Sequence, residues 1–149
     1  MTTISDNRKA RFNYEILETF EAGIVLLGTE IKSIRSARLN LNDAYAIVQH
    51  NELFLLNAHI SPYSHGNQFN HDPLRTRKLL VHGWQIRRLT GSVKEKGVAL
   101  IPTRAYWKNG RVKIEIGIGK GKQLHDKRQT IKEREWAREK SAILKGGGD

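Results

Sequence analysis

The stretch from Val112 to Ile118 reads V-K-I-E-I-G-I and follows closely on Asn109-Gly110. Its apolar residues occupy every second position, the period of a half-buried strand with one polar face. Asn-Gly is the dipeptide most favoured in two-residue hairpin turns. We therefore predict a hairpin that joins this strand to the strand-like segment 98–107, in which Pro102 indicates an edge or a bulge.

Two further hairpins are expected upstream. Residues 14–20 and 24–27 have strand-like patterns on either side of Glu21-Ala22-Gly23, which we interpret as a turn. Residues 45–48 and 53–55 alternate in the same way around a polar connection. Met1 to Asp6 is polar and is expected to be loose.

Three short helices are expected between the strands. Thr29 can cap the first, whose Leu27, Ile31 and Ile34 share one face and leave Lys32 and Arg35 outside. Asp72-Pro73 is a typical helix start. The second helix would expose Arg75, Arg77 and Lys78 and bury Leu74, Leu80 and Val81, whereas the third would bury Ile86, Leu89 and Val93.

These elements give a mainly β protein. About six antiparallel strands with two or three short inserted helices are typical of a small closed or partly open barrel. The barrel is expected to span residues 1–118, followed by a basic tail over residues 119–149. The tail opens on a Gly–Lys alternation at Gly119, which we expect to form neither strand nor helix.

Composition points to a nucleic acid or another anionic surface as the partner. The net charge is +11 and the sequence pI is about 10.1, more than solubility requires. The chain has no cysteine, which excludes disulfides and thiolate metal sites. Neither a secretory signal nor an apolar run of membrane-spanning length is visible, so we expect a soluble, cytoplasmic protein with no membrane partner.

The tail encodes a helix that has little to pack against. Thr130 and Glu133 fit a capping box, and the residues from about 131 to 144 lack Gly and Pro. A helix this short is marginal in water by itself. We therefore expect residues 119–149 to be disordered alone and helical when bound. The alternative is an ordinary C-terminal helix packed on the barrel.

The histidines allow two enzymatic interpretations. His65, His71 and Asp72 could form a metal site of a metal-dependent RNA hydrolase, although their spacing matches no short-range ligand pattern. His125 next to Asp126 resembles a general base with its orienting carboxylate, but it lies on the tail, where no pocket would hold a substrate. We expect no enzymatic activity, no cofactor and no metal, and a role for His125 in contacting RNA.

Several motifs follow one another along nearly the whole chain. They are N-R-K-A-R at 7–11, F-E-A-G at 20–23, G-T-E-I-K-S at 28–33, D-P-L-R-T-R-K-L-L at 72–80, Y-W-K-N-G at 106–110, H-D-K-R at 125–128 and I-K-E-R-E-W at 131–136. In this order they resemble the SmpB family of SsrA (tmRNA)-binding proteins.

The resemblance implies an OB-fold barrel that binds the tRNA-like part of tmRNA near its elbow. It implies an adapter for trans-translation, without catalytic activity, that brings tmRNA to stalled ribosomes. The tail would probe the empty mRNA channel past the decoding centre in 16S rRNA, leading to rescue of the ribosome and tagging of the nascent peptide for degradation. Elongation factor Tu, through alanyl-tmRNA, is a further implied partner.

The implied site residues fall into two sets. The resemblance places Asn7, Tyr14, Glu21, Tyr45, Lys78 and Leu80 at the tmRNA-binding face, and we add the basic residues Lys9, Arg11, Lys32 and Arg35. The set expected at the decoding centre and in the mRNA channel is Lys120, Lys122, His125, Asp126, Lys127, Arg128, Ile131, Lys132 and Trp136.

Two positions depart from the family pattern. Phe12 stands where some members carry His, and Gln123-Leu124 replaces a Lys and a polar residue. The resemblance therefore implies neither a histidine contact at the first position nor a strong rRNA contact at the second. The alternative function in the binding class is a general OB-fold RNA-binding or ribosome-associated protein without specificity for tmRNA.

Overall fold

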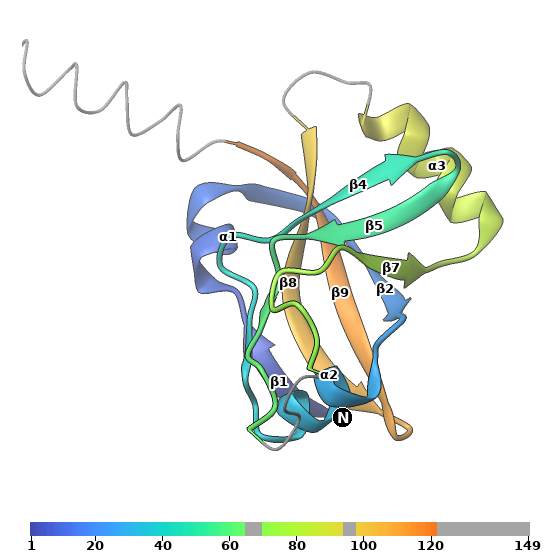
Figure 1. Cartoon of the computed structure of the whole chain (residues 1–149). Coiled ribbons are helices and arrows are strands. Elements are labelled where there is room, and N and C mark those ends of the chain that lie inside the picture. The colour runs from blue at the N-terminus through green and yellow to red at the C-terminus, as the bar shows by residue number, and fades with distance from the viewer. Residues whose placement is uncertain (65–69, 94–97, 122–149) are drawn as a thin grey trace, which may run out of the picture.

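A computed structural model describes residues 1–64, 70–93 and 98–121 of the chain. Within these residues three helices accompany a seven-stranded antiparallel sheet and a two-stranded one (Figure 1). The elements are β1 Thr2–Asp6, α1 Arg8–Asn13, β2 Glu15–Ile24, α2 Gly28–Arg35, β3 Leu39–Asn40, β4 Tyr45–Gln49, β5 Glu52–Leu56, β6 His59–Ile60, β7 Arg77–Leu80, α3 Gly83–Val93, β8 Val98–Lys108 and β9 Arg111–Lys120.

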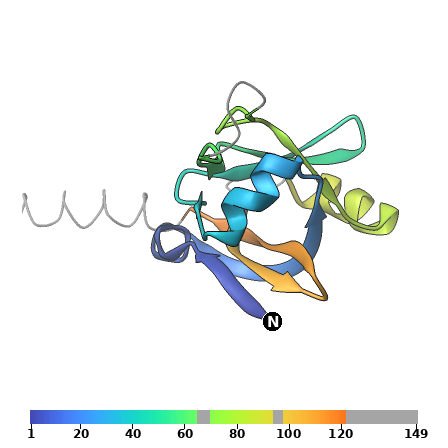
Figure 2. The same ribbon diagram turned by 60° about the horizontal axis from the view of Figure 1, so that its bottom comes forward.

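The larger sheet closes into a barrel. Its strand order is β1-β8-β4-β5-β7-β2-β9, and β9 also pairs with β8. Six strands therefore form the closed barrel, and β1 lies outside it along β8. Helix α2 lies across the end of the barrel that faces the viewer in Figure 2, and α1 and α3 lie on opposite sides. The predicted fold class, a small antiparallel barrel with short helices, is confirmed.

The β8–β9 hairpin follows the sequence pattern. Val112, Ile114, Ile116 and Ile118 are buried in the core, and the turn residues Asn109 and Gly110 both have positive φ. Pro102 lies at a bulge in β8, where the register shifts between Pro102 and Arg104. The strand is not an edge, because β8 also pairs with β1 and β4.

The predicted hairpin at residues 14–27 is wrong. Residues 21–23 do not turn, because β2 continues through them with β9 beside it as far as Gly23 and β7 beside Gly23 and Ile24. A Cβ on Gly23 would lie 3.3 Å from the Cβ of Leu80, so glycine permits a close approach of β7 here. The second predicted hairpin is confirmed as β4–β5, although Tyr45 faces outward and Ala46 is buried.

The helix predicted from Asp72-Pro73 is also wrong. The segment makes a turn, in which the Asp72 carboxylate accepts a hydrogen bond from the Leu74 N–H at 3.0 Å, and then enters strand β7. In this strand Arg77 and Leu79 point inward, whereas Lys78 and Leu80 point outward. Arg77, which we expected to be exposed, is therefore buried, and Leu80, which we expected to be buried, is exposed. The guanidinium of Arg77 can be buried because it donates a hydrogen bond to the carboxylate of Glu30 in α2.

Three boundaries also differ from the sequence prediction. Residues 2–6 are strand β1 paired with β8, not a loose segment. The cap of α2 is not Thr29: the helix starts at Gly28, and the Glu30 carboxylate accepts a hydrogen bond from the Leu27 N–H at 2.7 Å. Gly119 and Lys120 belong to β9, because Gly119 faces Ile16 and Ala99 on the neighbouring strands. The third expected helix is confirmed as α3, with Ile86 and Leu89 buried.

Candidate nucleic-acid interface

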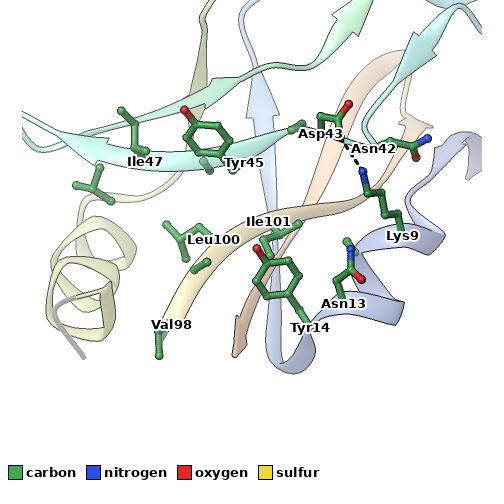
Figure 3. Close-up of a pocket in the computed structure, with 15 residues that line it drawn as sticks. Lys9, Asn13, Tyr14, Asn42, Asp43, Tyr45, Ile47, Val98, Leu100 and Ile101 are labelled. Carbon is green, nitrogen blue, oxygen red and sulfur yellow. Dashed lines mark hydrogen bonds and ion pairs between the residues drawn. The ribbon is translucent and has the colours of Figure 1, made fainter. Parts of the chain in front are cut away.

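A groove opens in the barrel wall between α1, β4 and β8. The backbone pairing of β4 with β8 is restricted to Ala46 and Leu100, so the two strands separate and leave a hollow of about 670 Å³. Tyr14 and Tyr45 lie on different sides of this groove, with Lys9 and Asn13 at one end (Figure 3). A groove lined by aromatic, amide and ammonium groups can contact bases, sugars and phosphates.

Asn7 positions α1 at the groove. Its side chain is fully buried and donates hydrogen bonds to the carbonyls of Leu41 and Pro102 at 2.9 and 2.8 Å. Its amide oxygen accepts from the Ala10 N–H at 3.0 Å and so caps α1. Buried Asn7 supports the groove and offers no surface to RNA.

One ion pair crosses the mouth of the groove. Lys9 Nζ lies 2.9 Å from the carboxylate of Asp43, and both side chains are exposed. An exposed pair of this kind contributes little stability, so Lys9 can exchange Asp43 for a phosphate at small cost. Tyr45 is 40% exposed and leaves part of its ring open to a ligand.

A second face lies where β2, β7 and β9 meet near α2. Two hollows of about 400 and 320 Å³ share Gly23, Leu80 and Lys113. Arg35 and Arg111 line the larger one, and Glu21 lines the smaller. Leu80 is 51% exposed among these charged groups. The face thus combines an apolar side chain with cationic groups, which can contact bases and phosphates.

Glu21 is held as a carboxylate in this face. Tyr106 donates a hydrogen bond to it at 2.5 Å, and Lys108 lies 3.2 Å away. The Tyr106 hydrogen bond, together with Lys108 and Lys113 and against partial burial, holds the pKa of Glu21 below its ordinary value. Burial and the same hydrogen bond raise the pKa of Tyr106. An ionised carboxylate at this position can accept a hydrogen bond from a donor such as a ribose hydroxyl or a base amino group.

A buried carboxylate holds α2 in place. Glu30 is fully buried, and its two oxygens accept hydrogen bonds from Arg75 at 2.7 Å and from Arg77 at 2.6 Å. Burial would raise the pKa of Glu30, but the two arginines and the Leu27 N–H outweigh it, so the pKa lies below the ordinary value. This cluster joins α2 to β7 and thereby positions the exposed residues of α2.

Sequence and structure comparisons identify relatives over nearly the whole chain. The family model described as SmpB protein matches residues 4–146. The chain belongs to the SmpB family. An SsrA-binding protein of Magnetococcus marinus is 61% identical over 142 residues, or 95% of each chain. One of Caulobacter vibrioides is 53% identical and covers 96% of this chain and 95% of its own.

A solved SmpB structure has the same fold. It is described as "tmRNA-SmpB: a journey to the center of the bacterial ribosome" and is 45% identical, with a TM-score of 0.67. The match covers 79% of this chain and 83% of that one. The expected membership of the SmpB family is confirmed.

Six of the ten residues expected at the tmRNA face of an SmpB protein line the two surfaces. Lys9, Tyr14 and Tyr45 line the groove, and Glu21, Arg35 and Leu80 line the second face. Asn7 is buried and supports the groove without lining it. The other three lie elsewhere: Arg11 pairs with Asp6, Lys78 lies 3.6 Å from Glu52, and the Lys32 ammonium lies 5.2 Å from the ring centre of Tyr63.

Of the residues expected in the ribosomal channel, Lys120 is the last residue of β9. Lys122, His125, Asp126, Lys127, Arg128, Ile131, Lys132 and Trp136 lie outside the described residues, as does the predicted helix that contains several of them.

Lys113, Arg111 and Asn13 line the two surfaces but were not singled out from the sequence. The signal was available for the first two, because they occupy the polar positions of the alternating strand β9. Asn13 had no such signal.

The metal site considered for His71 has no support among the described residues. His71 is buried, Nε2 donates to the Ile60 carbonyl at 2.9 Å, and Nδ1 lies 2.9 Å from the Thr29 hydroxyl. Both ring nitrogens therefore have partners within the protein. No group of three potential metal ligands occurs in the described part of the chain, from which His65 is excluded.

No helix described here is long and apolar enough to span a membrane.

Proposed function

We propose that this chain is the tmRNA-binding adapter of trans-translation. The observation that carries the proposal is the SmpB match over residues 4–146, together with high-identity relatives named SsrA-binding proteins. The barrel supports it with two separate surfaces, the Tyr14–Tyr45 groove and the Glu21–Leu80 face, each with cationic groups. Such surfaces can recognise the shape and the phosphates of a folded RNA.

In this function the barrel binds the tRNA-like part of tmRNA and carries it to stalled ribosomes, in the cytoplasm where ribosomes work. Residues beyond β9 enter the empty mRNA channel at the decoding centre and permit tagging of the nascent peptide. The solved relative described with tmRNA and the ribosome supports this assignment. Elongation factor Tu joins through alanyl-tmRNA, and the chain itself performs no chemistry.

Competition binding tests the proposal. Labelled tmRNA, the chain and increasing unlabelled competitor are mixed at about 0.15 M salt, where non-specific phosphate contacts are weakened. We expect unlabelled tmRNA to compete far better than bulk tRNA. Equal competition by the two would favour a general RNA-binding protein. Incubation of tmRNA with and without EDTA provides the enzymatic control, and we expect no cleavage in either sample.

A further inference from the structure

Helix α3 carries an exposed aromatic pair that the core does not need. Between residues 83 and 91 of α3 the buried residues are Ile86 and Leu89, whereas Trp84 is 54% exposed. The ring of His82, one residue before the helix, lies 6.3 Å from that of Trp84, and the two planes differ by only 7°. A flat base that stacks on Trp84 is therefore also parallel to His82.

Positive charge lies next to this pair. Arg87 and Arg88 follow on the exposed side of α3. Arg88 pairs with Glu18 at 2.7 Å, whereas Arg87 has no ion pair among the described residues, and its Nη1 lies beside Gly83 at the start of the helix. An indole next to an arginine without an acidic partner fits a base and its phosphate better than it fits an apolar protein segment.

The aromatic pair is continuous with the second face. His82 and Gln85 line the same 320 Å³ hollow as Glu21, Leu80 and Lys113. Trp84 lines a neighbouring hollow together with Glu18 and Phe20 of β2, and Gln85 lines both hollows. An RNA strand on the Glu21–Leu80 face therefore needs to extend by only a short distance to reach Trp84.

We propose that Trp84, with His82, forms a stacking platform for an unpaired nucleotide of tmRNA, and that Arg87 neutralises a phosphate of the same strand. The proposal rests on the proposed function, which supplies the RNA. It adds a third contact area that does not depend on the residues expected from the family resemblance.

Substitutions of Trp84 separate stacking from packing. Trp84→Phe keeps an aromatic face, whereas Trp84→Leu keeps an apolar side chain without one. With the tRNA-like part of tmRNA, we expect Trp84→Leu to weaken binding by about 5- to 100-fold and Trp84→Phe by less than about threefold. Leu74→Ala, which removes another exposed apolar side chain, is the matched control and should bind as the wild type does.

The salt dependence of binding separates the phosphate contact of Arg87 from base stacking on Trp84. Arg87→Gln should reduce the slope of log K against log salt by about 0.7–0.9, the value for one lost phosphate contact, while Trp84→Leu leaves the slope unchanged. Titration with the RNA should also quench more tryptophan fluorescence in the wild type than in Trp84→Phe. This signal does not depend on the folding of the leucine variant.

The outcomes distinguish this inference from the proposed function. If the wild type does not prefer tmRNA to bulk tRNA, the proposed function fails. If the wild type prefers tmRNA and a folded Trp84→Leu binds it equally well, the platform is overturned and the proposed function stands. Equal weakening in the Phe and Leu variants, or equal quenching in wild type and Trp84→Phe, also overturns the platform.

Discussion

The hydrogen bond from Tyr106 to Glu21 lowers the pKa of the carboxylate in the second face. We expect Tyr106→Phe to raise the pKa of Glu21 toward its ordinary value and to lower the free energy of unfolding at pH 7 by about 1 kcal/mol, since Glu21 is partly exposed. The measurement is NMR titration of Glu21 together with urea unfolding.

The sign of the pH effect follows from the lowered pKa. A carboxyl whose pKa is lower in the folded than in the unfolded state stabilises the protein above the unfolded value of about 4.3, and this contribution is lost as the pH falls through the folded value. The wild type should thus lose more stability than Tyr106→Phe between about pH 5 and pH 3. Parallel stability curves for the two proteins would contradict this prediction.

Glu30 and Glu52 provide a matched test of burial. Glu30→Gln leaves Arg77 buried without a charged partner and should lower the free energy of unfolding by about 3–5 kcal/mol. Glu52→Gln breaks an exposed pair with Lys78 and should cost about 0–1 kcal/mol. Urea unfolding measures both. A cost for Glu30→Gln no larger than that for Glu52→Gln would show that the buried cluster is not what holds α2.

Single residues were predictable where the signal was local. Lys32 and Arg35 are exposed as the helical spacing predicts. Arg77 is expected at the surface only because it falls on the exposed side of the helix predicted from Asp72-Pro73. Its partner Glu30 lies 47 positions away in the sequence. A short stretch of sequence cannot contain both residues, so the ion pair is visible only in the folded structure.

At the scale of elements, Gly119 permits the close contact of β9 with the Tyr14 segment. A Cβ there would lie 3.1 Å from the Cβ of Tyr14 and 3.3 Å from the carbonyl oxygen of Glu15. These atoms move only with the backbone, so we expect Gly119→Ala to cost about 1–3 kcal/mol and to displace Tyr14 from the groove.

Gly28→Ala is the control for Gly119→Ala, because nothing lies within 4 Å of its Cβ position at the start of α2. It should be neutral or stabilise the protein by up to about 1 kcal/mol. Thermal unfolding of both variants provides the comparison. Equal effects at the two positions would mean that the contact with Tyr14 is not tight.

The elements that sequence predicted correctly are those whose pairing is local. The β4–β5 and β8–β9 hairpins each join neighbouring strands through a short turn, and Asn109-Gly110 marks one of them. Strands β1 and β7 were missed because their partners are distant in the sequence. Strand β1 pairs with residues about 100 positions away, and β7 pairs with residues 22 to 26 and 55 to 57 positions away. Long-range pairing also kept β2 straight through Glu21-Ala22-Gly23, against the turn tendency of those residues.

For the whole molecule, the sequence predicted the barrel and the family more completely than it predicted the strand order, whereas the two sets of RNA-contacting residues stay a prediction. Charge and motif order are properties of the chain as a whole. Conclusions drawn from them therefore hold even where a single helix or strand is predicted wrongly. The division into a barrel at 1–118 and a tail at 119–149 remains a proposal, and strand β9 moves its boundary to after Lys120.

The central claim is that the barrel binds tmRNA and that the residues after it are needed on the ribosome. The most direct test compares the yield of tagged peptide from a chain that ends at Gly121 with that from the full chain, on ribosomes stalled at the end of a message. Both proteins are used at concentrations that saturate tmRNA, with binding checked by gel shift. We predict tmRNA affinity within about threefold of the full chain, because the barrel keeps β9 complete, and no tagged product. Normal tagging by the shortened chain, or loss of its tmRNA binding, would contradict the account.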